Sequence, residues 1–150
     1  MPGEGLERFV EAQDWLLAMS GRSVYAGALE ELRQGRKRTH WMWFVFPQIA
    51  GLGSSDMSRH YAIASLDEAR RYLRHPVLAA RLRECTRAVL DVEGRTAEDI
   101  LGGIDAAKLR SSMTLFELAD PREPLFAAAL GKFYAGERDA ATLRLAGRAG

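Results

Sequence analysis

The sequence predicts an all-α fold, a multi-helical bundle of about nine helices without a sheet, in a single domain over residues 1–150. Three observations support this prediction. Apolar residues recur every three or four positions through most of the chain, whereas the alternation with period two that marks a half-buried strand is missing. Capping residues, prolines and glycines stand where these helical stretches begin and end. No stretch rich in glycine, serine and proline divides the chain.

The first part of the chain predicts two helices. Apolar residues with helical spacing begin at Leu6, and the pattern stops at Gly21. A second helix is expected over residues 23–34, and Gly35 stands where a left-handed C-cap would fall. The basic residues 36–38 follow directly, and cations are favourable at a helix C-terminus.

Residues 41–46 form an aromatic segment of six consecutive large apolar residues, which holds two of the three tryptophans and two of the six phenylalanines. Burying one such side chain contributes roughly 1.5–3 kcal/mol, so this segment must belong to the core. By propensity it fits a buried strand as well as a helix. A helix capped by Thr39 and ended by Pro47 is preferred, because a lone strand has no partner for its backbone groups.

The middle of the chain predicts three further helices. A loop over residues 51–55 precedes a short helix that Ser54 or Ser55 caps, and a capping box from Ser65 to Glu68 opens the next. Pro76 starts the longest helix, which Gly94 closes. Its apolar stripe is Leu78, Leu82, Cys85, Val89 and Val92, so Cys85 is interpreted as a buried structural thiol.

Cap and stop signals predict the remaining helices. Four helices are expected, from Thr96 to Gly102, from Asp105 to Asp120, from Pro124 to Gly136, and from Asp139 to Leu143.

Composition restricts the function classes. The formal net charge is +1, from 21 basic and 20 acidic residues, which argues against a general nucleic-acid or membrane-surface binder. One cysteine and three histidines far apart in sequence offer no metal-ligand spacing, and we expect no metal and no cofactor. No apolar run approaches the roughly 18 residues of a membrane span, and the first residues lack a signal-peptide pattern, so a cytoplasmic location is expected.

Two segments have unusual composition, His-Trp-Met-Trp-Phe-Val-Phe-Pro-Gln at positions 40–48 and Lys-Leu-Arg-Ser-Ser-Met-Thr-Leu-Phe at positions 108–116. With further matches along nearly the whole chain, they resemble the bacterial and fungal family catalogued as domain of unknown function 1810, often labelled "calpastatin" by automatic transfer. The resemblance implies a small, all-α, cytoplasmic domain and supplies no function. A calpastatin would be a long disordered polar chain, unlike this composition. Residues between Trp15 and Arg22 look like an insertion relative to the family.

Polar side chains flank the aromatic segment and recur on the helix expected around residue 110. The candidate ligand-binding residues are Lys37, His40, Trp41, Trp43, Gln48, Tyr61, Lys108, Ser111 and Ser112. Helix geometry places Lys108 and the two serines on one face, which suits a phosphate or carboxylate. His40 and His60 are the candidate acids or bases, because histidine titrates near neutral pH. We expect His40, Gln48, His60 and Lys108 to converge on one cleft.

Structural roles for the same residues stay open. The serines can bond to the helix backbone, Lys108 can pair with Asp105, and His40 can satisfy a buried carbonyl. Three functions remain at this stage. The preferred one is binding, with or without hydrolysis, of a small anionic or nucleotide-like ligand stacked on Trp41 or Trp43. The alternative is a protein–protein interaction module without catalysis. Nucleic-acid binding through residues 36–38 is disfavoured by the neutral total charge.

Overall fold

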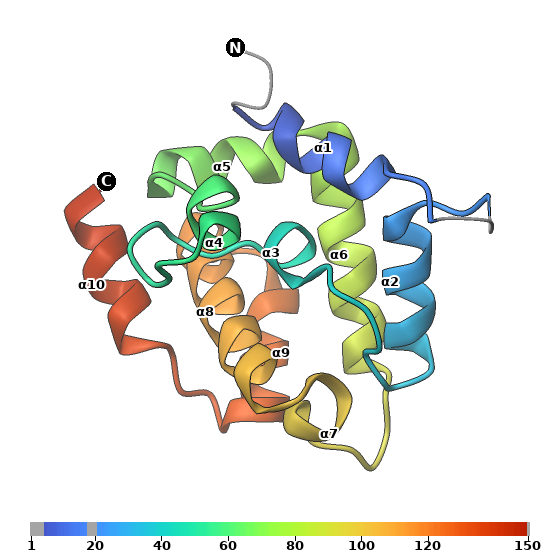
Figure 1. Cartoon of the computed structure of the whole chain (residues 1–150). Coiled ribbons are helices and arrows are strands. Elements are labelled where there is room, and N and C mark those ends of the chain that lie inside the picture. The colour runs from blue at the N-terminus through green and yellow to red at the C-terminus, as the bar shows by residue number, and fades with distance from the viewer. Residues whose placement is uncertain (1–4, 18–20, 150) are drawn as a thin grey trace.

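The computed structural model describes residues 5–17 and 21–149. Over this part of the chain it contains helices and no strands, which confirms the all-α prediction (Figure 1). It has ten helices there, one more than expected. They are α1 (Glu7–Asp14), α2 (Val24–Arg33), α3 (Met42–Val45), α4 (Asp56–His60), α5 (Leu66–Arg74), α6 (Pro76–Leu90), α7 (Ala97–Leu101), α8 (Gly103–Ala119), α9 (Pro124–Tyr134) and α10 (Ala140–Ala149).

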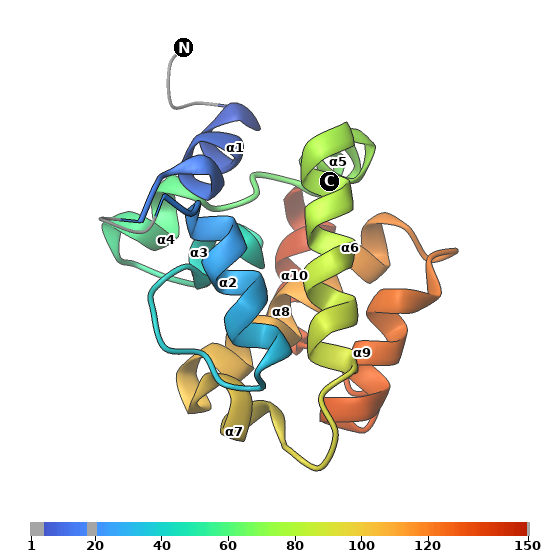
Figure 2. The same ribbon diagram turned by 90° about the vertical axis from the view of Figure 1, so that its right-hand side faces the viewer.

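Helix α8 lies at the centre of the bundle. It packs against α5, α7, α9 and α10, while α6 packs on α5 and α9 and also on α1, α2 and α3 (Figures 1 and 2). Buried residues lie on more than one side of α8, which is typical of a helix enclosed by neighbours. Phe116 is fully buried, and its ring contacts those of Tyr72 on α5 and Phe126 on α9.

Most helix starts follow the predicted caps. The side chains of Ser55, Ser65 and Thr96 each accept a hydrogen bond from a backbone N–H of the first turn. Thr96 and Asp99 form a complete capping box. His75 caps α6, because its Nδ1 accepts from two backbone N–H groups just after Pro76.

Three caps differ from the sequence prediction. Asp105 lies inside the first turn of α8, which begins at Gly103. Thr39 does not cap α3, because its hydroxyl donates to the carboxylate of Glu31, 2.6 Å away. The left-handed residue that ends α9 is Ala135, with φ of 54°, one position before the expected Gly136.

The aromatic segment, residues 41–46, is largely helical, so the helix interpretation holds over the strand. Trp41 and Phe46 are fully buried, while Trp43 is half-buried. Phe46 has φ of −124° and ψ of 72°, outside the α region, as expected for the residue before a proline.

Cys85 is buried in α6, and burial raises the pKa of its thiol to about 12. At residues 15–22, the segment expected to be an insertion, Leu16 pairs with Ser23 through an isolated antiparallel bridge, and the Trp15 ring packs edge-on against Phe44. Residues 18–20 of this segment lie outside the described residues. Within residues 5–17 and 21–149, no helix has the length and apolarity to cross a membrane.

Candidate functional site

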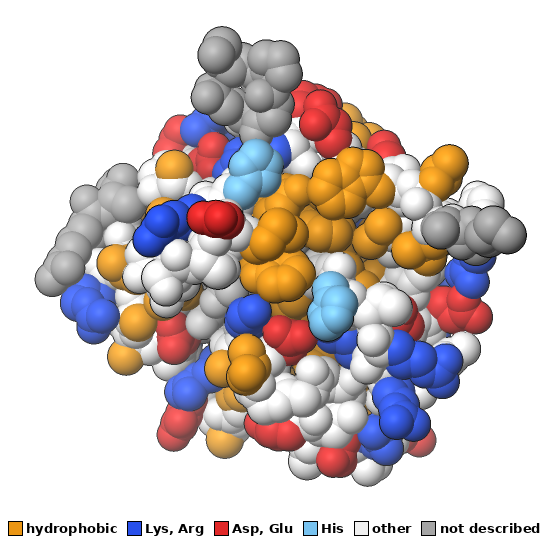
Figure 3. All heavy atoms as spheres, viewed as in Figure 1, with side chains coloured by type: hydrophobic (Ala, Val, Ile, Leu, Met, Phe, Trp, Pro, Cys, Tyr) orange, Lys and Arg blue, Asp and Glu red, His pale blue; other side chains and the backbone are white. Residues whose placement is uncertain are grey.

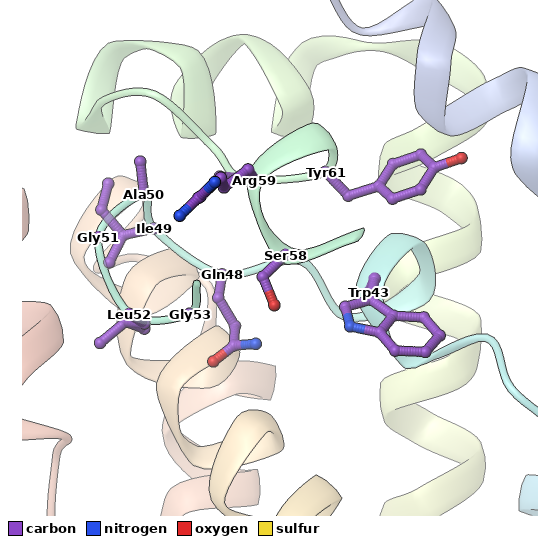
Figure 4. Close-up of a pocket in the computed structure, with 11 residues that line it drawn as sticks. Trp43, Gln48, Ile49, Ala50, Gly51, Leu52, Gly53, Ser58, Arg59 and Tyr61 are labelled. Carbon is purple, nitrogen blue, oxygen red and sulfur yellow. The ribbon is translucent and has the colours of Figure 1, made fainter. Parts of the chain in front are cut away.

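A cavity of about 280 Å³ lies between the 48–53 loop, which follows the aromatic segment, and α4. Figure 4 shows the side chains around it. The lining residues are Trp43, Gln48, Ile49, Ala50, Gly51, Leu52, Gly53, Ser58, Arg59, Tyr61 and Ala62. They all come from one stretch of sequence, so the cavity is formed by the chain folding back on itself.

Backbone hydrogen bonds hold the 48–53 loop in place. Ile63 N–H donates to the Gln48 carbonyl at 2.8 Å, and Ala50 N–H donates to the Ile63 carbonyl at 2.8 Å. Gly53 is needed for close packing, since a Cβ atom there would lie 2.6 Å from Ser58 Cβ. Gly51 has φ of +103°, a conformation that other residues rarely adopt. The loop therefore has a defined path against α4.

A buried arginine holds the other wall. Arg8 of α1 donates from Nε to the carbonyl of His60 at 2.8 Å and from Nη2 to the carbonyl of Ala62 at 2.6 Å. Its Nη2 also pairs with Glu68 of α5 at 3.3 Å, and both side chains are at most 10% exposed. The end of α4 is thus tied to α1 and α5 through one guanidinium.

Several side chains with hydrogen-bond donors stand among the apolar residues that line the cavity. The indole of Trp43, the amide of Gln48 and the guanidinium of Arg59 make no hydrogen bond or ion pair with the described residues through their side chains. In Figure 4 the Ser58 hydroxyl and the Gln48 amide project to the side of the loop on which Trp43 lies, and the Arg59 guanidinium extends toward the loop. No aspartate or glutamate is among the lining residues. Such a lining suits a ligand with negative charge and several acceptor oxygens.

Two lysines and one aspartate lie next to Trp41 and Trp43. Lys108 Nζ lies over the Trp43 ring, 5.0 Å from its centroid, and Lys37 Nζ lies over the Trp41 ring at 5.2 Å. Asp105 pairs with both ammonium groups, at 3.0 Å from Lys37 and 3.5 Å from Lys108. The pairing of Lys108 with Asp105 that the sequence allowed is therefore present, together with a contact to the cavity wall.

Glu31 organises the segment that carries Lys37. Its carboxylate accepts from the backbone N–H groups of Arg38 and Thr39, from the Thr39 hydroxyl and from Nε1 of Trp41. Burial alone would raise the pKa of Glu31, but these hydrogen bonds outweigh it and hold the pKa below the ordinary value. The charged form of Glu31 is thus favoured by folding.

This shift predicts a loss of stability in acid. The pKa of Glu31 is lower in the folded chain than its value of 4.5 in the unfolded chain. Its contribution to the free energy of unfolding is therefore complete above pH 4.5 and is lost as the pH falls through the folded-state pKa. We expect the Glu31→Gln variant to be less stable than the wild type at pH 7, and the difference to shrink at about pH 3.5. Urea unfolding at both pH values measures it. Glu93→Gln is the control, because Glu93 is exposed and its carboxylate makes no hydrogen bond or ion pair with the described residues; an equal pH dependence in both variants would contradict the role of Glu31.

The structure brings together some of the predicted site residues. Trp43, Gln48 and Tyr61 line the cavity. Burial raises the pKa of the Tyr61 phenol, and the charge of Glu11 adds to the effect, so Tyr61 is neutral at neutral pH. Lys108 reaches the cavity only through Trp43.

Other predicted residues lie elsewhere. Trp41 is fully buried and bonded to Glu31, so it offers no free ring for stacking. Ser111 is buried and donates to the Ala107 carbonyl, while the fully buried Ser112 hydroxyl has no partner in the described part of the chain. His40 and His60 are exposed, and neither is among the lining residues. The expected convergence of His40, Gln48, His60 and Lys108 on one cleft is not observed at this cavity.

Of the lining residues whose side chains carry polar atoms, Ser58 and Arg59 were not predicted as site residues. One signal could have indicated them. Ser58 stands three positions after the N-cap Ser55. Ser58 and Arg59 therefore both lie in the short helix α4, beside the loop that contains Gly51 and Gly53.

Of the described residues, no three or more histidine, cysteine, aspartate or glutamate side chains form a group that could hold a metal ion.

Comparisons with known proteins agree with the fold. The model of the family described as "Protein of unknown function (DUF1810)" matches residues 3–146. The crystal structure of the conserved hypothetical protein Rv1873 from Mycobacterium tuberculosis is 51% identical in sequence, with a TM-score of 0.86, and the match covers 93% of this chain and 94% of that chain. No curated protein matches the chain. The resemblance found in the sequence is confirmed, and the chain belongs to the DUF1810 family of proteins of unknown function.

Proposed function

We propose that this protein binds a small anionic ligand with a planar group in the cavity between the 48–53 loop and α4. One observation carries the proposal. The Arg59 guanidinium lines the cavity without an ion pair to any described residue, in a lining that contains no carboxylate. A guanidinium surrounded by further donors favours a carboxylate or phosphate group. Trp43 supplies an apolar surface for a planar group.

The size of the cavity limits the ligand. Its volume of about 280 Å³ lies near the lower end of the range for ligand sites, about 300–1,000 Å³. A compact anion of one or two rings, such as the nucleotide-like ligand considered from the sequence, suits this volume better than a dinucleotide.

Binding without hydrolysis is the simpler form of the proposal. Among the described lining residues there is no histidine, cysteine, aspartate or glutamate that could serve as a base or nucleophile. Ser58 and Tyr61 are the lining residues with a hydroxyl group. Ser58 Oγ accepts a hydrogen bond from the Ser55 hydroxyl at 2.8 Å rather than contacting a base, and burial raises the pKa of the Tyr61 phenol. The lining therefore supports recognition and offers no activated nucleophile.

A second candidate function is docking of a partner protein. Trp15 and Leu16 are 52% and 73% exposed, and Trp15 packs on Phe44 of the aromatic segment. Figure 3 shows hydrophobic side chains gathered on the face that carries α3. An exposed apolar patch of this kind is a feature of interaction surfaces. It remains second, because nothing about the patch specifies the chemistry of a partner.

Titration calorimetry on the full chain tests the proposal. The probes are adenosine 5′-monophosphate, ribose 5-phosphate and benzoate, which separate phosphate from carboxylate and planar from non-planar ligands. We expect binding of at least one planar anion, and a weakening of about 10- to 100-fold in the Arg59→Gln variant, because a hydrogen bond to a charged group is lost. The melting midpoint should change little, since Arg59 is exposed.

Arg122→Gln is the matched control, because it removes the same charge from an exposed residue outside the cavity lining. Its affinity for each probe should equal that of the wild type. The proposal is wrong if none of the three probes binds, or if the two arginine variants have the same affinity.

A further inference from the structure

One face of the Trp43 indole is occupied by a cation. Lys108 Nζ lies over the ring at 5.0 Å from its centroid, yet Lys108 is not among the cavity-lining residues, whereas Trp43 is. A ligand in the cavity would therefore contact Trp43 without contacting Lys108.

Asp105 fixes the position of Lys108 without fully neutralising it. The same carboxylate pairs more closely with Lys37, at 3.0 Å against 3.5 Å, and the Lys37 side chain is only 9% exposed. Two ammonium groups thus share one carboxylate beside the two tryptophans. Glu31 does not pair with either lysine, because its carboxylate accepts hydrogen bonds from Trp41 Nε1, the Thr39 hydroxyl and the backbone N–H groups of Arg38 and Thr39. The cluster of Lys37, Lys108 and Asp105 therefore keeps a net positive charge, and its Lys108 ammonium lies next to Trp43 in the cavity wall.

A cation over one face of an aromatic ring changes what the ring binds. Cages of bare aromatic faces attract cationic ligands, because the face of the ring is negative. Here the ammonium draws that electron density toward itself and adds its own positive field. The uncovered side of Trp43 is then less suited to a cation and better suited to an electron-rich, negatively charged ring.

We propose that the cavity selects compact planar aromatic acids, and that Lys108 is the specificity-determining residue, acting through Trp43. The acidic group lies toward Arg59 and the ring stacks on the indole, within a volume of about 280 Å³. This inference rests on the proposed function, because it names the class of ligand for the same site. Lys108 is a positioning residue here, since it does not line the cavity.

The experiment compares four probes of graded chemistry by titration calorimetry on the full chain. Naphthalene-2-carboxylate is the planar acid, naphthalene-2-carboxamide its neutral analogue, cyclohexanecarboxylate a non-planar acid, and 2-naphthyl phosphate a planar phosphate. We expect both naphthyl acids to bind at least about tenfold more tightly than the carboxamide and the cyclohexane acid. The ratio of carboxylate to phosphate affinity identifies which acidic group the site prefers.

Lys108→Met removes the charge and keeps the length of the side chain. We expect the affinity ratio of carboxylate to carboxamide to fall by about tenfold, with the carboxamide affinity unchanged, and we expect Lys108→Arg to retain the wild-type ratio. A purely structural lysine would weaken both probes together. Lys132→Met is the control, because Lys132 also lies over an aromatic ring, at 5.3 Å from the Phe133 centroid, but lines no part of the cavity.

The outcomes separate the two proposals. An unchanged ratio in Lys108→Met overturns the role of Lys108, and equal affinity for cyclohexanecarboxylate and the naphthyl acids overturns the aromatic class while leaving anion binding in place. Failure of every acid to bind contradicts the proposed function itself. If Lys108→Met lowers the melting midpoint, the ratio is measured in Lys108→Gln, which keeps a polar end for Asp105.

Discussion

Replacing Arg8 by methionine is expected to lower the free energy of unfolding by about 3–5 kcal/mol, because one partner of a buried ion pair is removed and the other stays buried. Arg8 and Glu68 are 8% and 10% exposed, so water cannot readily replace the lost contacts. The carbonyls of His60 and Ala62 also lose their donor. Urea unfolding followed by circular dichroism measures the effect.

The control for this variant is a surface ion pair. Arg71 pairs with Asp67 one turn away on α5 at 3.3 Å, with side chains 54% and 69% exposed. Arg71→Met should change stability by less than about 0.5 kcal/mol. Equal effects of the two substitutions would show that the Arg8 guanidinium does not hold α4 in place.

Phe116→Ala is expected to reduce the free energy of unfolding by about 3–5 kcal/mol, the range for removing a buried aromatic ring. Phe116 is fully buried, and its ring centroid lies 5.2 Å from that of Tyr72 and 5.8 Å from that of Phe126. The substitution leaves a cavity among three helices, which cannot all move inward together. The shift of the urea midpoint, with an unchanged slope, gives the size of the effect.

Ile104 offers the matched comparison for Phe116. It lies on the same helix, α8, but is 78% exposed, so Ile104→Ala should have little effect. A change below about 1 kcal/mol for Phe116→Ala would contradict the packing of α5, α8 and α9 around this ring.

The helices could be predicted because their signals are local. The side-chain caps at Ser55, Ser65 and Thr96 depend only on residues within three positions. The prediction for Thr39 was wrong because a distant acceptor, Glu31, took its hydroxyl. No pattern within the aromatic segment reveals that competition.

The site was only partly predictable for the same reason. Trp43, Gln48 and Tyr61 stood out by composition, and all three line the cavity. The contact of Lys108 with Trp43 joins residues 65 positions apart (108 − 43), and spacing along the chain cannot indicate it. Nothing in the sequence around Arg59 marks it, because a lone surface arginine is common; it lines the cavity because the 48–53 loop folds back beside α4.

The most direct test of anion binding in the cavity is a nitrogen–proton correlation spectrum of the ¹⁵N-labelled chain, titrated with naphthalene-2-carboxylate. Each of the three tryptophans contributes one indole N–H signal, and their environments differ. Trp43 lines the cavity, Trp41 is fully buried with its N–H bonded to Glu31, and Trp15 is 52% exposed. We predict a saturable shift of the Trp43 indole and Gln48 amide signals, with the Trp41 and Trp15 signals unmoved. A shift of Trp15 alone, or no shift of Trp43 at saturating probe, would contradict the account.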